Sequence, residues 1–265
     1  MSLSDYFADV LLKHIVGLDT YTMPSWIYMG LGVGSVPIEV LGVGTGYTRF
    51  ASQPSLWSAA SGGEIHNTTA AAFPEATGDW GLITSLLFYD TGTVGTGNLL
   101  MTSTLTTPRQ IVTGSLPKFA ISAISVSEVL KFSDYWENKL LDHIFGKASL
   151  TAPSNIFVAL SSTNPLDSGA GITEPSGMSY ARVSTSSGDW TLVLSRSLFN
   201  NTAITFPTAS GEWGTMNWCA LFDAASGGNM LAFGALSISK SIGVGQVAKF
   251  SAYPPAGNNL ILNFA

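Results

Sequence analysis

The sequence of 265 residues contains a single cysteine, Cys219. One cysteine can form neither an internal disulfide framework nor a Cys-x-x-Cys metal site. The residue lies in the apolar run 218–222, where we expect a buried and unreactive thiol. The chain has only three histidines, and they are scattered, so the sequence predicts no metal site and no cofactor.

Charge is also scarce. Charged residues make up 11% of the chain, whereas roughly 25% is usual in a soluble domain. The formal net charge is −6 and no run of lysine or arginine occurs, which excludes the cationic surface that nucleic-acid binding needs. A surface with little charge has little repulsion to oppose self-association, so we expect a homo-oligomer or another large assembly. The alternative is an ordinary neutral secreted domain.

Long uninterrupted hydrophobic runs are missing as well. The most apolar stretch, residues 23–44, is broken by Pro24, Pro37, Glu39 and several glycines. A helix through this stretch could not span a membrane. The N-terminus also lacks the basic region and apolar run of a signal peptide. We therefore expect a soluble protein without a membrane partner.

What the chain does contain is a repeat. Residues 4–17 and 133–146 share eight of fourteen positions. Further matches follow at offsets between 129 and 134 residues, among them 47–50 with 180–183. A period near 130 residues suits an independent domain with its own core and is too long for a solenoid repeat. The sequence predicts two homologous domains, 1–130 and 131–265, with a boundary near Leu130.

Each repeat begins with a predicted helix. Ser4 and Ser133 are favourable N-caps, and Gly17 and Gly146 stand where a left-handed C-cap is expected. Apolar residues recur at every fourth position in between, which gives each helix a stripe that can pack on a sheet. These residues are Phe7, Leu11 and Ile15 in the first helix and Trp136, Leu140 and Ile144 in the second.

Short β-like runs follow each helix, separated by clusters of Gly, Pro, Ser and Asn. The predicted strands of the first repeat are 25–31, 65–73, 83–89, 98–105 and 118–125. Those of the second are 154–160, 180–185, 190–195, 202–206, 216–222, 229–236, 246–252 and 259–264. Many short strands between turns predict a mostly β fold, with two tandem antiparallel β-sandwich or barrel domains, jelly-roll-like, each with a short N-terminal α-helix.

The repeats differ most after their first strand. The second has a polar loop at 161–169, whereas the first has an apolar, glycine-rich segment at 30–42. An apolar loop in one copy alone predicts contact with a dry surface. The predicted interface residues are Leu31, Val33, Val36, Ile38, Val40 and Leu41. The alternative is that this segment folds back on its own core.

Two histidines are the best catalytic candidates because both repeats keep them, as His14 and His143. With Ser4 and Asp5, His14 suggests a hydrolytic triad. However, Asp5 and His14 lie nine residues apart on one helix and so on opposite faces, beyond hydrogen-bond reach. We expect each histidine to interact with the C-terminus of its helix, and we predict no catalytic residue.

The tryptophans offer a candidate carbohydrate-binding face. Trp80 and Trp213 are equivalent residues of a repeated Gly-x-Trp-Gly motif, which favours a role in the core. Trp57 and Trp190 lie in similar surroundings rich in Ser and Gly. These two are the candidates for stacking against a ligand such as a host glycan.

The repeated residues resemble a known family. The run 133–146, the segment 204–207 and the turn 221–229 (Leu-Phe-Asp-Ala-Ala-Ser-Gly-Gly-Asn) are similar to a family of tailed-bacteriophage virion proteins commonly labelled phage tail fibre protein. Its members are about as long as one repeat, so this chain looks like a tandem duplication. The first repeat departs from the pattern at 30–46. The resemblance implies a structural protein of the virion, assembled in the host bacterial cytoplasm, and it supplies no catalytic residues.

Three functions remain open. The sequence favours a capsid cement or decoration protein, because the chain lacks the periodicity of a fibre shaft and two fused copies could bridge capsid subunits. A tail fibre or adhesin component that contacts the host is the alternative, and a carbohydrate-binding or glycan-cleaving module is the third. In the first two, the partners are other virion proteins, either the major capsid protein or tail proteins.

Overall fold

The computed structural model describes residues 1–127, 132–192, 196–253 and 261–263. Contacts divide the chain into two compact units. Unit 1 comprises Met1–Ala8, Thr22–Val129 and Asn138–Leu150, and unit 2 comprises Asp9–Tyr21, Leu130–Glu137 and Thr151–Ala265. Each unit therefore includes a helical segment that the sequence assigns to the other repeat.

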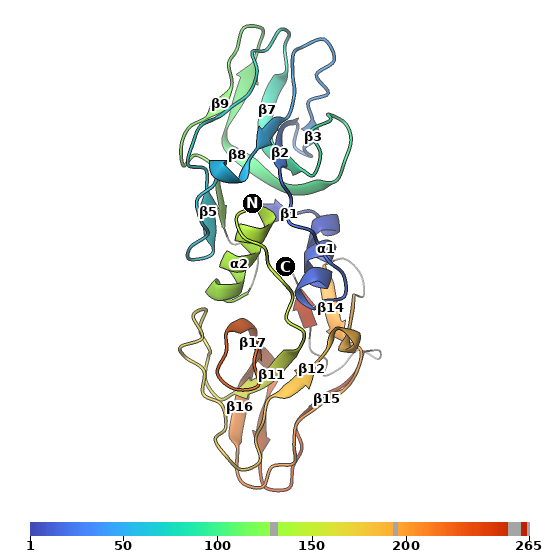
Figure 1. Cartoon of the computed structure of the whole chain (residues 1–265), viewed down its shortest axis with the longest axis vertical. Helices are drawn as coiled ribbons and strands as arrows, with labels where there is room; N and C mark the ends of the chain where they lie inside the picture. The colour runs from blue at the N-terminus through green and yellow to red at the C-terminus, as the bar shows by residue number, and fades with distance from the viewer. Residues whose placement is uncertain (128–131, 193–195, 254–260, 264–265) are drawn as a thin grey trace. The chain divides into compact units, whose positions relative to one another are not determined.

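The two predicted helices are present, as α1 (Asp5–Ile15) and α2 (Asp134–Ile144) (Figure 1). The hydroxyl oxygens of Ser4 and Ser133 accept hydrogen bonds from the N–H groups of Phe7, at 3.1 Å, and Trp136, at 3.4 Å. This is the N-cap that the sequence predicts.

Both helices also end as predicted. Gly17 and Gly146 have φ of +73° and +71°, the left-handed conformation that closes a helix with a glycine. The apolar stripe of each helix is buried throughout. Burial of such a stripe supplies most of the stability of a helix as short as these.

Unit 1 is built on an antiparallel sheet with the strand order β1-β8-β7-β2-β3, in which β4 also pairs with β2. Its strands are β1 (Ser2–Leu3), β2 (Ile27–Val33), β3 (Ile38–Glu39), β4 (Phe50–Ser52), β7 (Gly81–Tyr89) and β8 (Leu99–Ile111). A short 3-10 helix, η1 (Pro54–Leu56), and two small sheets complete the unit. The small sheets pair β5 (Glu64–His66) with β10 (Ser125–Ser127) and β6 (Ala71–Ala72) with β9 (Lys118–Phe119).

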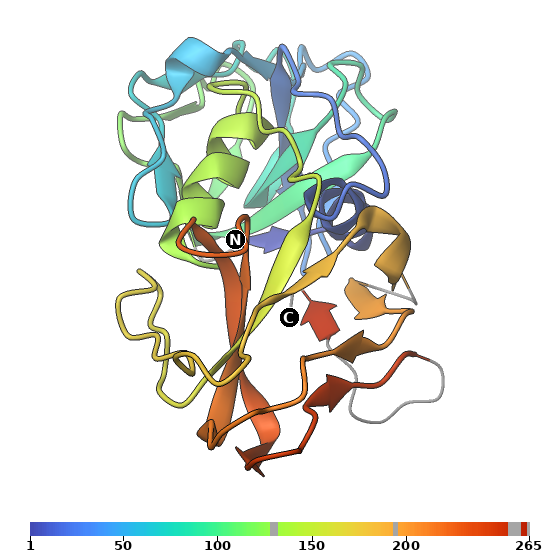
Figure 2. The same cartoon turned by 60° about the horizontal axis from the view of Figure 1, so that its bottom comes forward.

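Unit 2 repeats this plan in a sheet of order β12-β11-β16-β17, whose yellow and orange strands Figure 2 shows alongside one another. Its strands are β11 (Ile156–Ser161), β12 (Val183–Thr185), β16 (Gly214–Phe222) and β17 (Met230–Ile242). The 3-10 helix η2 (Ser187–Asp189) precedes a second sheet, β13-β14-β19. The remaining strands are β13 (Trp190–Leu192), β14 (Ser197–Asn200), β15 (Ile204–Thr205), β18 (Lys249–Phe250) and β19 (Ile261–Asn263), and β15 pairs with β18.

The two units share details of pairing as well as strand order. In unit 1 the ladder between β7 and β8 is interrupted between Ile83 and Ser85. In unit 2 the ladder between β16 and β17 is interrupted at the equivalent place, between Met216 and Trp218. The predicted fold class is confirmed: a mostly β chain with two repeated antiparallel modules and one short helix in each.

Several strand predictions differ from the structure in their limits. The predicted strand 65–73 is two short strands, and β8 continues six residues beyond the predicted end at 105. Strands β3, β4 and β14 were not predicted, because runs of two to four residues show no usable periodicity. Residues 128–131 at the predicted boundary, 193–195, and 259, 260 and 264 of the predicted last strand lie outside the described residues.

Each unit holds the helical segment from the other repeat through equivalent bonds. In unit 1, Oδ1 of Asn138 accepts the N–H of Gly63 at 3.0 Å. In unit 2, Oδ1 of the equivalent Asp9 accepts the N–H of Arg196 at 2.8 Å. The predicted domains 1–130 and 131–265 stay a prediction, since the units are compact groups of contacts and not lengths of sequence.

Candidate functional surfaces

A buried ion pair forms the main polar cluster of unit 1. Nε of Arg49 donates to Oε1 of Glu39 at 2.6 Å, and a terminal nitrogen donates to Oε2 at 2.7 Å. The other terminal nitrogen donates to the carbonyls of Thr91 and Thr96. The guanidinium also stacks 3.5 Å from the ring centre of Tyr89. Every donor direction of this arginine is therefore used inside the protein.

Tyr47 joins the same cluster. Its hydroxyl donates to Oε1 of Glu39 at 3.3 Å and accepts the N–H of Leu31 at 2.8 Å. Burial raises the pKa of Tyr47 well above its ordinary value. The phenol therefore stays protonated and remains a donor to Glu39.

Unit 2 contains the equivalent cluster. Arg182 donates to both carboxylate oxygens of Glu174, the shortest bond being 2.6 Å, and stacks 3.5 Å from the ring centre of Phe222. The hydroxyl of Tyr180 donates to Glu174 at 2.8 Å and accepts the N–H of Leu160. These groups bond one another in both units, so they brace the β2–β4 and β11–β12 regions and leave no group for chemistry.

Sequence analysis found only part of these clusters. The repeated Tyr-x-Arg motif at 47–49 and 180–182 was visible. The glutamates escaped because they lie in the segment where the repeats differ most, at an offset of 135 residues instead of 133. An unpaired arginine in an apolar repeat was the available signal, since a buried arginine requires an acidic partner.

The repeated histidines, His14 and His143, lie buried in the last turns of their helices. Nδ1 of His14 accepts the N–H of Tyr21 at 3.2 Å, and Nδ1 of His143 accepts the N–H of Leu150 at 3.0 Å. A nitrogen that accepts an N–H carries no proton. The rings therefore fix the chain that leaves each helix, a more specific role than the predicted interaction with the helix C-terminus.

Trp57 and Trp190, the candidates for ligand stacking, are core residues in the structure, 2% and 1% exposed. The indole N–H of Trp57 donates to the hydroxyl of Ser52, and that of Trp190 donates to Thr185. The ring of Trp57 also packs 4.3 Å from that of Phe145, centre to centre. Rings buried to this extent offer no face to a glycan, so the stacking hypothesis is not supported. Trp80 and Trp213 are buried as expected.

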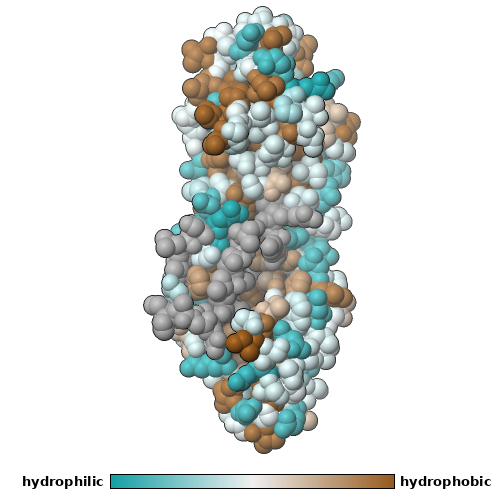
Figure 3. All heavy atoms as spheres, turned by 180° about the vertical axis from the view of Figure 1, so that it is seen from behind, coloured by the Kyte–Doolittle hydropathy of each residue, from teal (hydrophilic) through white to brown (hydrophobic). Residues whose placement is uncertain are grey.

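The structure separates the six predicted interface residues into two groups. Three lie buried or half-buried within unit 1: Leu31, Val33 and Val40. Three are exposed on the turn between β2 and β3 and just beyond it, together with a fourth aliphatic residue that was not predicted: Val36, Ile38, Leu41 and Val43. We call these four residues the aliphatic hairpin. Figure 3 shows brown, hydrophobic residues of this kind on the surface of unit 1.

The corresponding loop of unit 2 has a different character. Its hydroxyl and amide side chains bond to the loop backbone: Ser161 to the carbonyl of Thr163, Thr163 to that of Gly171, and Asn164 to the N–H of Leu166. The predicted contrast between a polar loop and an apolar loop is therefore a feature of the folded protein. The difference makes the aliphatic hairpin specific to unit 1.

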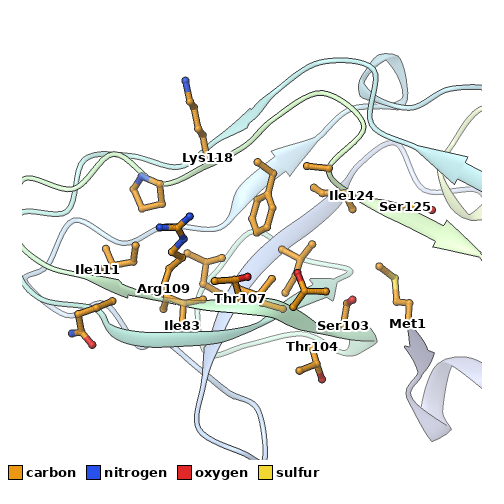
Figure 4. A pocket seen from close by; sticks show the side chains of 18 of the residues that line it. Met1, Ile83, Ser103, Thr104, Thr107, Arg109, Ile111, Lys118, Ile124 and Ser125 are labelled. Carbon is orange, nitrogen blue, oxygen red and sulfur yellow. The ribbon is translucent and has the colours of Figure 1, made fainter.

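A cavity of about 730 Å³ lies in unit 1 beside the distal half of β8. Figure 4 shows Arg109 on one side of it and Lys118 on the other. Hydroxyl side chains of β8, including Ser103 and Thr107, also line it. Sequence analysis did not single out any of these residues.

Other kinds of site receive no support. Within the described ranges, no three His, Cys, Asp or Glu side chains gather in a way that could bind a metal ion. No helix in the same ranges has the length and hydrophobicity to cross a bilayer. Cys219 is buried as predicted, and burial raises the pKa of its thiol to about 11, so the thiolate is not available as a nucleophile near neutral pH.

The family model described as podophage GP4 fiber I protein gp80 matches the chain twice, over residues 2–127 and 131–254. The chain belongs to this family. The two matches follow the two repeats and confirm both the resemblance to phage fibre proteins and the tandem duplication. No curated protein matches the chain.

Membership of the podophage fibre family makes the protein a structural component of the virion, as predicted. Its partners accordingly include other virion proteins. Among the functions left open by the sequence, the family supports the fibre alternative better than the capsid cement role that the sequence favoured. Homo-oligomerisation, glycan binding and the absence of enzymatic activity stay predictions.

Proposed function

We propose that the protein is a component of the phage tail fibre apparatus that contacts the host surface. The observation that carries this proposal is the match of both repeats to a fibre family, over nearly the whole chain. The fold is consistent with it, since clusters such as Arg49–Glu39 are satisfied internally and serve stability.

Immunogold electron microscopy of intact virions with antibodies against the purified chain tests this location. We expect gold particles at the tail and its appendages. Labelling distributed over the capsid faces would contradict the proposal and support the cement role instead. In parallel, purified protein added to host cells before infection should reduce phage adsorption, because it occupies the surface that the fibre contacts.

We further propose that the aliphatic hairpin attaches unit 1 to another virion protein. Burying one isoleucine side chain contributes roughly 1.5–3 kcal/mol, and a difference of about 1.4 kcal/mol changes an affinity tenfold. Four exposed aliphatic residues close together in the chain thus suffice for a stable contact, and the surrounding surface has little charge to oppose it.

The chain offers a matched control for this surface. Ile38 in the hairpin and Ile121 elsewhere in unit 1 are both 63% exposed. We predict that Ile38→Ser lowers the number of copies per virion, measured by quantitative immunoblotting, whereas Ile121→Ser leaves it unchanged. Equal incorporation of the two variants would show that the hairpin is not the attachment surface.

A further inference from the structure

The cavity beside β8 results from an irregularity of the main sheet. Ser85 of β7 pairs with Thr104, but Ile83, two residues away, pairs with Arg109. Residues 105–108 of β8 therefore bulge out of the ladder opposite a single residue of β7. A bulge of this kind redirects the side chains next to it, and Arg109 is the first residue of β8 to rejoin the ladder.

The same arrangement occurs in unit 2 with a cation at the same place. Trp218 pairs with Ala235 and Met216 pairs with Lys240, so Lys240 is the first residue to rejoin the ladder after the bulge. The cation of β9, Lys118, likewise has an equivalent in Lys249 of β18. A chain with 11 basic residues and 17 acidic ones thus keeps two cations at equivalent places in both units.

Arg109 differs from the arginines of the buried clusters. Within the described residues its side chain has no hydrogen bond or ion pair, and it is exposed. Figure 4 shows the guanidinium directed into the space between β8 and the segment that carries Lys118, while the amino group of Lys118 points outward at the rim. The fork of donors of Arg109 is therefore open to a ligand.

The lining of the cavity suits a ligand that is both polar and acidic. Its inner surface includes the buried aliphatic residues Ile83, Leu86 and Ile124, and no carboxylate lies among the described residues that line it. The one carboxylate bonded to a lining residue is Glu64, which accepts the hydroxyl of Ser125. In Figure 4, Ser125 lies well away from Arg109.

We propose that this cavity binds an acidic saccharide, a sugar residue that carries a carboxylate or phosphate group. Arg109 would hold the acidic group through paired N–H donors, the geometry that a guanidinium offers to both anions. The hydroxyls of Ser103 and Thr107 would bond the sugar hydroxyls, and the aliphatic floor would contact the apolar face of the ring. A volume of about 730 Å³ lies in the usual range for small-ligand sites.

The composition of the cavity favours this class of ligand over others. A nucleic acid would need a row of cations to neutralise successive phosphates, whereas Arg109 is the one cation directed into the cavity. A neutral sugar would leave the guanidinium without a partner. An acidic protein segment would use Arg109 but would have little use for the hydroxyls of Ser103 and Thr107.

The inference rests on the proposed contact with the host surface, and calorimetric titration of the full chain tests it. The probes are polygalacturonate for carboxylates, dextran phosphate for phosphates and unmodified dextran as the neutral polymer. We expect binding of at least one acidic polymer, weakened as salt is raised, and no binding of dextran. The stronger of the two acidic probes identifies the anionic group.

Two variants locate the binding. Arg109→Gln should lower the affinity at least tenfold, and Arg109→Lys should give an intermediate loss because lysine keeps the charge without the fork. Lys139→Gln, which removes one charge from the exposed side of α2, should have no effect. Because Arg109 is exposed and its side chain has no recorded partner, the variants should keep the wild-type circular dichroism spectrum and melting temperature.

Equal losses in Arg109→Gln and Lys139→Gln would overturn the proposal, since the attraction would then come from general charge. Polyglutamate binding that depends on Arg109, with neither acidic polysaccharide bound, would also overturn it in favour of an acidic protein partner. If no polymer binds while virion labelling and adsorption assays still succeed, this inference fails and the proposed function stands. If those assays fail too, both are wrong.

Discussion

Each repeat buries an arginine that is paired with a glutamate, in a chain that otherwise has few charges. Both partners of the Arg49–Glu39 pair are almost fully buried, with side chains 0% and 6% exposed. The Arg182–Glu174 pair is more open, at 7% and 20%. Removing one partner of a buried pair strands the other charge in a medium of low dielectric, and the cost of that state exceeds the net value of the pair.

We therefore predict that Arg49→Met lowers the free energy of unfolding by about 3–5 kcal/mol, and that Arg182→Met costs less because water reaches its partner. The double variant Glu39→Gln/Arg49→Met should lose less than the sum of the two single changes. Chemical denaturation of the full chain measures all four. Strictly additive losses would show that the two side chains do not act as a pair.

Single residues also mark where prediction from sequence ends. The burial of Trp80 and Trp213 was predictable, because a repeated motif fixes their surroundings. The burial of Trp57 was not, because the ring that covers it, Phe145, comes from the helix of the second repeat. Periodicity and composition describe neighbours along the chain, and they carry no information about such a distant contact.

Among the elements, the helices were the most predictable. Their caps, stripes and closing glycines are local signals that the sequence displays twice. The glycines nevertheless differ in their surroundings. A Cβ on Gly17 would lie 3.6 Å from the nearest atom, in ordinary contact, whereas a Cβ on Gly146 would lie 2.7 Å from the carbonyl oxygen of Pro24.

This difference gives a matched pair of substitutions. Gly17→Ala should cost about 1 kcal/mol, the strain of placing a side chain at positive φ. Gly146→Ala should cost more, because the backbone at Pro24 must also move. We expect the lower melting temperature for Gly146→Ala in differential scanning calorimetry. Equal melting temperatures would mean that the contact with Pro24 relaxes without cost.

The strands were predictable in number and approximate place, and much less so in their limits. The prediction for β8 ended at 105 because the alternation of apolar and polar residues stops at the bulge, which includes Pro108. The cavity and Arg109 were missed for the same reason. A site that depends on a break in the ladder leaves no periodic signal in the sequence.

At the scale of the whole molecule, two repeats of one fold have diverged mainly in their loops. The aliphatic hairpin of unit 1 corresponds to a self-bonded polar loop in unit 2. The fold class followed from the repeat and from the short strands. Which loop residues are exposed did not, because half of the apolar residues at 31–41 turn inward.

The composition of unit 1 predicts how truncated chains behave. A chain of residues 1–130 lacks Asn138–Leu150, whereas a chain of residues 1–152 includes every segment of unit 1. We predict that the longer fragment resists trypsin and shows a cooperative thermal transition, and that the shorter one is degraded rapidly. Equal resistance of the two fragments would show that the segment from the second helix is dispensable.

The division of α1 and α2 between the units has a consequence for the history of the gene. An ordinary tandem duplication is easily reversed by recombination between the copies, which restores one self-sufficient module. Here a deletion of either copy would also remove a piece of the surviving one, including the ring that covers Trp57. Once each copy had come to depend on a segment of the other, selection would oppose the return to a single copy.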